Sequence, residues 1–182
     1  PSDLNHLLEQ AKAKAKDVRK TAIVGLAQST DPSAIEALKQ ALASADVELA
    51  AQPASQNQDP KLLEFLLEQA DKQRAEILST KDKKKLSPLL TRYYQLLSAF
   101  AGRGDKGTLA MLGKGFDERD QIAKLTGQVD GGDINRKLCI MMLLSGSKPL
   151  MKQLAGMAEE LDDILFEYGL LAAAVLETPA AF

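Results

Sequence analysis

Two stretches decide the fold class: residues 18–27, VRKTAIVGLA, and residues 31–38, DPSAIEAL. In the first stretch the apolar residues continue a spacing of three and four positions that begins at Leu4, which predicts one helix over residues 2–29. In the second stretch Asp31 is a good helix N-cap and Pro32 a good first helical residue, which predicts a new helix over residues 32–44. The two stretches therefore predict a helix, a short turn and a second helix.

The same start signal recurs further along the chain. Asp-Pro at residues 59–60 and Ser-Pro at residues 87–88 each precede an apolar run at helical spacing. Residues 51–58 are small and polar, which predicts a loop, and residues 80–85 are charged, which predicts a connection. No segment shows the alternation of a strand, so the predicted fold class is all-α. The later helices are expected at residues 61–79, 88–101, 106–115, 117–127, 134–145 and 147–176, with a split near Glu159 in the last.

Helix pairs of this kind also align with one another inside the chain. Residues 18–50 fall on residues 92–124 after a shift of 74 positions, and a further shift of 42 continues the alignment. A true structural repeat and a series of generic helical hairpins both explain this agreement. The positions that coincide are Ile23, Leu97 and Cys139; Leu26, Phe100 and Met142; Leu38, Leu112 and Leu154; and Asp31, Asp105 and Ser147.

The Val-Arg start, the alanine-rich helix, the Asp-Pro turn and the apolar second helix of residues 18–44 resemble a HEAT repeat. The resemblance is weaker over residues 92–116 and does not extend to residues 46–86. It implies an irregular α-solenoid or an orthogonal helical bundle of stacked helix hairpins that share their apolar faces. It also implies a scaffold or adaptor, the role of most HEAT-like proteins.

The expected organisation is an N-terminal helical hairpin over residues 1–50, a linker or loop over residues 51–60 and a helical-repeat body over residues 61–182. One continuous domain over residues 1–182 is the alternative.

Composition narrows the classes of function. Of the 182 residues, 45% are apolar, which is enough for a core and excludes a disordered chain. The single cysteine, Cys139, excludes disulfides and cysteine-built zinc sites, and a lone histidine, His6, removes most imidazole chemistry. We expect Cys139 to lie in the core and His6 to be exposed. We expect no catalytic residue, cofactor or metal.

The chain shows no signal peptide at its start, and its longest apolar run, residues 164–176, is too short to cross a bilayer, which needs about 20 residues. The expected location is the cytoplasm, without membrane association.

Two charged groups are the candidate interaction surface. The lysine cluster, which consists of Lys81, Lys83, Lys84 and Lys85, is expected in a solvated loop. The acidic residues Glu159, Glu160, Asp162 and Asp163 belong to a C-terminal part with no basic residue after Lys152. Apolar residues between positions 150 and 175 keep a four-three spacing, which favours either packing inside the domain, a partner helix or self-association.

These observations predict a non-catalytic helical-repeat module that binds another protein as an adaptor, scaffold or regulatory subunit. The alternative is a nucleic-acid-associated helical protein that uses residues 81–85, although a net charge of −2 argues against it. An enzyme that uses carboxylates alone would need Glu159, Asp163 or Glu167 to converge in a pocket.

Overall fold

The computed structural model describes residues 3–127, 132–160 and 162–177, and within these ranges the predicted all-α fold is confirmed. The described residues form eleven helices and no strand. The helices are α1 (Leu4–Gln10), α2 (Lys16–Leu26), α3 (Pro32–Ala43), α4 (Val47–Gln56), α5 (Pro60–Ser79), α6 (Lys83–Phe100), α7 (Lys106–Asp117), α8 (Arg119–Thr126), α9 (Gly132–Leu144), α10 (Lys148–Ala155) and α11 (Asp163–Glu177).

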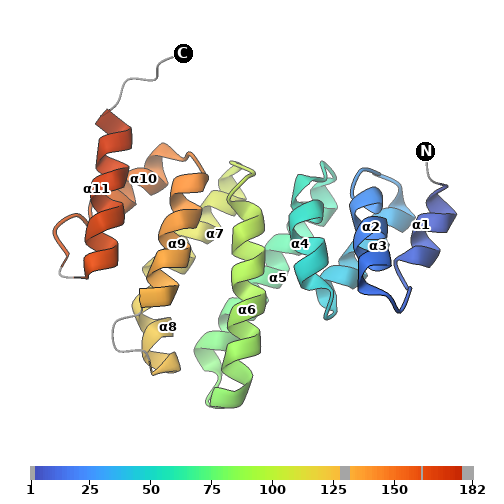
Figure 1. Cartoon of the computed structure of the whole chain (residues 1–182), viewed down its shortest axis with the longest axis horizontal. Helices are drawn as coiled ribbons and strands as arrows, with labels where there is room; N and C mark the ends of the chain where they lie inside the picture. Colours follow the sequence, from blue (N-terminus) through green and yellow to red (C-terminus); the bar gives the residue numbers. More distant parts are fainter. Residues whose placement is uncertain (1–2, 128–131, 161, 178–182) are drawn as a thin grey trace.

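The helices stack in two layers along the length of the molecule (Figure 1). Helices α2, α4, α6, α9 and α11 form the front layer, and α3, α5, α7 and α10 lie behind them. Every helix from α2 to α11 contributes a side chain to one buried apolar cluster. Apolar packing is therefore continuous along the stack, without an interruption near residues 51–60.

Each back-layer helix begins with the same kind of cap. Asp31, Asp59 and Asp105 accept hydrogen bonds from backbone amides of the first turn of α3, α5 and α7 at 2.8, 2.8 and 3.1 Å. Ser147 has the same place at the start of α10. These caps satisfy amides that a helix leaves without a partner. Helices at the aligned positions of the sequence thus begin with similar caps, and α4 contacts α5 in the region where no repeat was expected.

The aligned apolar positions are also equivalent in burial. The caps Asp31 and Asp59 lie 28 positions apart. The same shift takes Leu26 to Ala54 on α4 and Leu38 to Leu66 on α5, and both of these side chains are buried. Cys139 is buried as predicted, and desolvation raises the pKa of its thiol to about 12. Nine side chains at the aligned positions are fully or almost fully buried: Ile23, Leu97 and Cys139; Leu26, Phe100 and Met142; and Leu38, Leu112 and Leu154.

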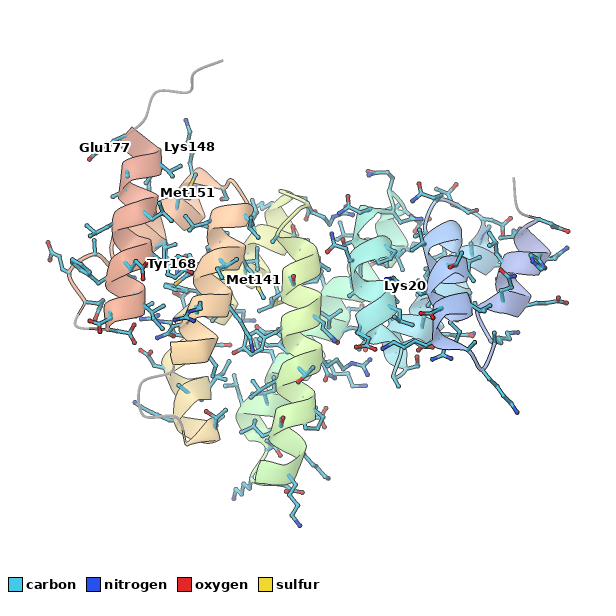
Figure 2. The ribbon with its side chains drawn as sticks, in the orientation of Figure 1. Lys20, Met141, Lys148, Met151, Tyr168 and Glu177 are labelled. Atoms are coloured by element: carbon cyan, nitrogen blue, oxygen red, sulfur yellow. The ribbon has the colours of Figure 1, made fainter. Side chains whose placement is uncertain are left out.

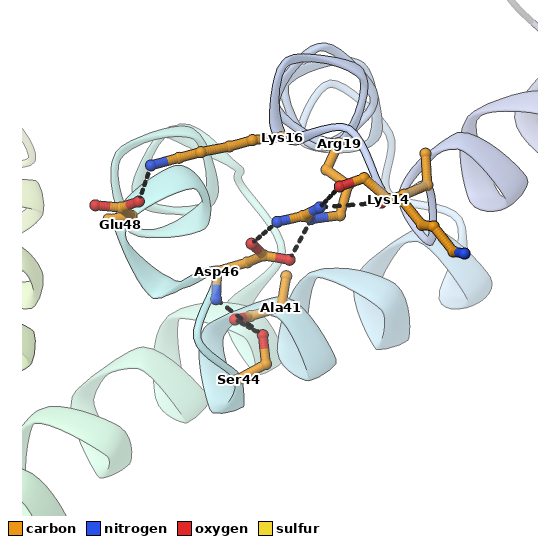
Figure 3. A network of polar contacts seen from close by, with 8 residues as sticks. Lys14, Lys16, Arg19, Ala41, Ser44, Asp46 and Glu48 are labelled. Carbon is orange, nitrogen blue, oxygen red and sulfur yellow. Dashed lines mark hydrogen bonds and ion pairs between the residues drawn. The ribbon is translucent and has the colours of Figure 1, made fainter.

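The single helix expected over residues 2–29 is wrong, because the chain leaves the helix after Gln10 and re-enters it at Lys16. Figure 3 shows the polar contacts that hold this break. The guanidinium of Arg19 donates to the carbonyls of Ala13 and Lys14 at 3.0 and 2.8 Å and to both carboxylate oxygens of Asp46 at 2.8 and 2.9 Å. The break lets α1 fold back over α2 and α3, where its leucines pack against the core.

The loop expected over residues 51–60 is also wrong for residues 51–56, which belong to α4. This helix buries Ala50, Ala51, Ala54 and Ser55, so it packs closely against α2 and α6 with small side chains. A proline inside a helix costs about 3 kcal/mol, and burial of this face offsets the cost of Pro53. Because the side chains that residues 51–56 bury are alanine and serine, the segment lacks the large apolar residues that predict a helix, and its sequence predicted a loop.

Side chains from one helix pair bind the end of a helix in the preceding pair. Asn57, in the turn between α4 and α5, donates to the carbonyls of Ala27 and Ser29 after α2 at 2.8 and 2.9 Å. Arg103, in the turn between α6 and α7, donates to the carbonyls of Ser55 and Asn57 at the end of α4. Carbonyls at a helix C-terminus lack partners inside the helix, so these donors fix successive turns to one another.

Replacement of Asn57 by alanine is expected to lower the free energy of unfolding by about 1–3 kcal/mol, because the buried carbonyl of Ala27 and the amide of Asp59 lose their partner. Urea denaturation followed by circular dichroism measures the change. The matched control is Gln58→Ala, an exposed neighbour whose loss is expected to cost less than about 0.5 kcal/mol. Equal stability of the two variants would contradict the role of Asn57.

Candidate interaction surface

Helix α11 is apolar on both of its sides. Its inner side buries Leu165, Gly169 and Ala172 against the stack. On the opposite side Phe166, Leu170, Leu171 and Val175 are exposed, and about half of the surface of Leu170 is open to solvent (49%). A helix that is apolar all round is typical of a buried position, yet α11 is the last helix of the stack.

Two contacts fix where α11 lies. Gly169 is at a close approach of two backbones, since a Cβ there would lie 2.6 Å from the amide nitrogen of Ala158. Asp162 caps the helix, accepting from the amide of Leu165 at 2.9 Å and from the side chain of the buried Asn135 on α9 at 3.2 Å. Tyr168 lies on the side of α11 toward α9 (Figure 2). The outer side of α11 is thus held in a defined orientation.

The neighbouring front-layer helix also exposes large apolar side chains. On α9 the side chains of Ile140 and Leu144 are exposed, and Leu144 is the most exposed large apolar side chain among the described residues (72%). Of the eight exposed large apolar side chains described, six lie on α9 and α11, and the other two, Val18 and Val24, lie on α2. We call these six the C-terminal apolar surface: Ile140, Leu144, Phe166, Leu170, Leu171 and Val175.

Acidic side chains accompany this surface. Glu159, Glu160 and Asp163 are exposed in or beside the α10–α11 connection, and Asp162 is half-buried as the cap of α11. Glu167 and Glu177 add two exposed carboxylates on α11, which has no basic residue. Among the described residues, none of these six carboxylates forms an ion pair. The predicted acidic group therefore belongs to one region, and no ion pair with another described side chain neutralises its charge.

The lysine cluster lies elsewhere in the molecule. The expected loop over residues 81–85 is wrong for residues 83–85, which form the first turn of α6, capped by Asp82 through the amide of Lys84 at 2.9 Å. Lys81, Lys84 and Lys85 are exposed, and the side chain of Lys83 is outside the described part of the structure. Helix α9 separates α6 from α11 in the front layer (Figure 1), so the lysine cluster and the acidic group are not brought together.

The clefts of the molecule lie between neighbouring helices. The described clefts include three with volumes of about 490 Å³ between α6, α8 and α9, about 810 Å³ between α4 and α6, and about 620 Å³ between α7 and α10. None of these three clefts is lined by Glu159, Asp163 or Glu167. Over the described residues, no group of three or more metal-ligating side chains occurs, and no helix has the length and apolar character needed to span a bilayer.

Comparison with known protein families gives no matching family model, and comparison with curated proteins gives no significant match. The resemblance of residues 18–44 to a HEAT repeat therefore stays a prediction.

The sequence pattern found only part of this site. It singled out the acidic residues and the apolar residues between positions 150 and 175. It predicted, however, that these apolar residues share one continuous helix side. The structure splits this range into α10 and α11, as the expected break near Glu159 indicated, and a single 150–175 helix for self-association does not exist. The signal for the outer side was present in α11 itself, DILFEYGLLAAAVLE, whose apolar residues occupy every side of a helix.

Replacement of Gly169 by alanine is expected to lower the free energy of unfolding by about 1–3 kcal/mol, because the added methyl group meets the backbone of Ala158. The control is Gly102→Ala, where the added Cβ would meet only the side chain of Gln56 at an ordinary distance of 3.7 Å. Thermal and urea unfolding of both variants measure the difference. A Gly169→Ala variant as stable as the wild type would show that α11 is not held at this distance.

Proposed function

We propose that the chain is a helical-repeat module that binds another protein, as an adaptor, a scaffold or a regulatory subunit. The observation that carries this proposal is the C-terminal apolar surface on α9 and α11. Large apolar patches at the surface of a protein mark interaction sites, because their exposure to water is unfavourable. The outer side of α11 is the part of this surface that lies at the end of the stack.

The two ends of the stack differ in a way that supports the proposal. At the N-terminal end α1 turns Leu4, Leu7 and Leu8 toward the core and exposes Asn5 and Glu9. Such a polar outer side is stable in contact with water, as in the capping units of repeat proteins. On α11 the exposed side instead carries four large apolar side chains beside the carboxylates of Asp163 and Glu167, which supports binding of another molecule there. His6 is exposed on α1, in accord with the expectation.

The nucleic-acid alternative has less support. Lys81, Lys84 and Lys85 are exposed around one helix start, but the tyrosines that follow them on α6, Tyr93 and Tyr94, are buried. Proteins that bind single strands combine basic side chains with exposed aromatic rings that stack on bases. The lysine cluster offers the charge without such rings.

Affinity capture from an extract of the source cells tests the proposal. A variant that carries Leu144→Ser and Leu170→Ser is expected to lose a protein that the wild type retains, because both side chains belong to the C-terminal apolar surface. The matched control is Val24→Ser, which changes an exposed valine on α2 and is expected to retain that protein. Both variants change exposed residues, so the stack is preserved, and circular dichroism verifies this.

Quantitative mass spectrometry compares the three captured samples, and nuclease treatment separates direct binding from binding through nucleic acid. The same set of proteins on the wild type and on the double variant would contradict a binding role for α9 and α11. Loss of every partner after nuclease treatment would instead favour the nucleic-acid alternative.

A further inference from the structure

We propose that the outer side of α11 binds an amphipathic helix of another protein that carries Lys or Arg beside its apolar stripe. This inference rests on the proposed function and adds the chemistry of the partner. The structural basis is an exposed apolar helix side at the end of the described stack, together with carboxylates that form no ion pair among the described residues.

The shape of the site fits a helix. In the front layer α4 contacts α2 and α6, and α9 contacts α6 and α11, so each has a neighbour on either side. Helix α11 contacts α9 on one side and has no described front-layer neighbour on the other. Phe166 and Leu170 lie one turn apart, as do Leu171 and Val175, so they form two rows of side chains. A packing helix places its own side chains in the groove between two such rows.

The charge of the site specifies the partner. Asp163 and Glu167 are exposed one turn apart on α11, and Leu170 and Leu171 follow on the next turn. Six acidic residues and no basic residue follow Lys152, namely Glu159, Glu160, Asp162, Asp163, Glu167 and Glu177. Complementary charges around an apolar contact favour the correct partner and disfavour wrong ones. A helix with Lys or Arg at the border of its apolar stripe is the complement.

The same charges disfavour the other ways to cover α11. In a two-fold pair of α11 helices the carboxylates of Asp163, Glu167 and Glu177 would face the acidic residues of the second copy, and like charges repel. In an end-to-end contact α11 would meet α1, whose outer side is polar. Helices that lie on membranes carry Lys and Arg on their polar side, and anionic lipids would repel the carboxylates of α11.

Fluorescence anisotropy with two designed peptides tests this proposal on the whole chain. The first is a labelled 18-residue helix with leucines at helical spacing and lysines elsewhere, and the second has glutamate at every lysine position. We expect the lysine peptide to bind the wild type and the glutamate peptide to fail. Because binding would bury the exposed side chain of Leu170, Leu170→Ser is expected to weaken binding of the lysine peptide about tenfold.

Charge reversal supplies the second arm. Glu167→Lys is expected to weaken binding of the lysine peptide severalfold, and the matched reversal Glu36→Lys, at an exposed position of α3, is expected to leave it unchanged. Added salt should reduce the difference between these two variants, since salt screens charge. All three changed positions, 36, 167 and 170, are on the surface, and circular dichroism of each variant confirms that the fold is retained.

Several results would overturn the proposal. The first is that the lysine peptide does not bind the wild type. The second is that the wild type and Leu170→Ser bind this peptide equally well, and the third is that Glu167→Lys and Glu36→Lys change its binding by the same amount. A dimer in sedimentation that Leu170→Ser abolishes would assign the surface to a second copy. Binding to phosphatidylserine vesicles that Leu170→Ser abolishes would assign it to a lipid surface.

The outcome also separates this inference from the proposed function. If the lysine peptide fails but the double variant on α9 and α11 still loses a cellular partner, the surface binds a protein of another chemistry. If both experiments fail, the binding role of the surface is wrong as well.

Discussion

The constraint on which the structure depends is that no helix pair can bury its apolar side alone. Each pair packs against the next. Hydrogen bonds from side chains in one turn to the carbonyls at the end of a preceding helix fix the relative positions of the pairs. Asn57 binds the end of α2, and Arg103 binds the end of α4. Because these contacts link successive turns, the pairs keep one direction of stacking, and one apolar cluster runs from α2 to α11.

The two ends of the described stack differ in the side chains that they expose. Helix α1 closes the N-terminal end with a polar outer side, whereas α11 leaves apolar side chains and carboxylates open at the other end. The close approach at Gly169 and the cap by Asp162 hold α11 in place, so its outer side is a preformed surface. Preformed surfaces bind with little loss of conformational freedom, which favours affinity.

Much of the fold could be predicted from the sequence. Caps such as Asp31 and Asp105, and apolar residues at helical spacing, act locally and therefore show in the sequence. The break at residues 11–15 could not be predicted, because alanine and lysine favour a helix there and the ion pair between Arg19 and Asp46 is formed across the fold. Helix α4 was missed because its packing uses alanine and serine. The acidic group of the site was found, but the exposure of Leu170 depends on where the stack ends, which no local pattern shows.

The most direct test of the central claim is photo-crosslinking from the outer side of α11 in cells. A benzoyl-phenylalanine replaces Leu171, or Val24 in a control, and mass spectrometry identifies the linked peptide. The account predicts that position 171 links to a helical segment of another protein with lysine or arginine within two turns of the linked residue, and that position 24 does not. Links from position 171 to this same chain or to lipid, or the same yield at both positions, would contradict it.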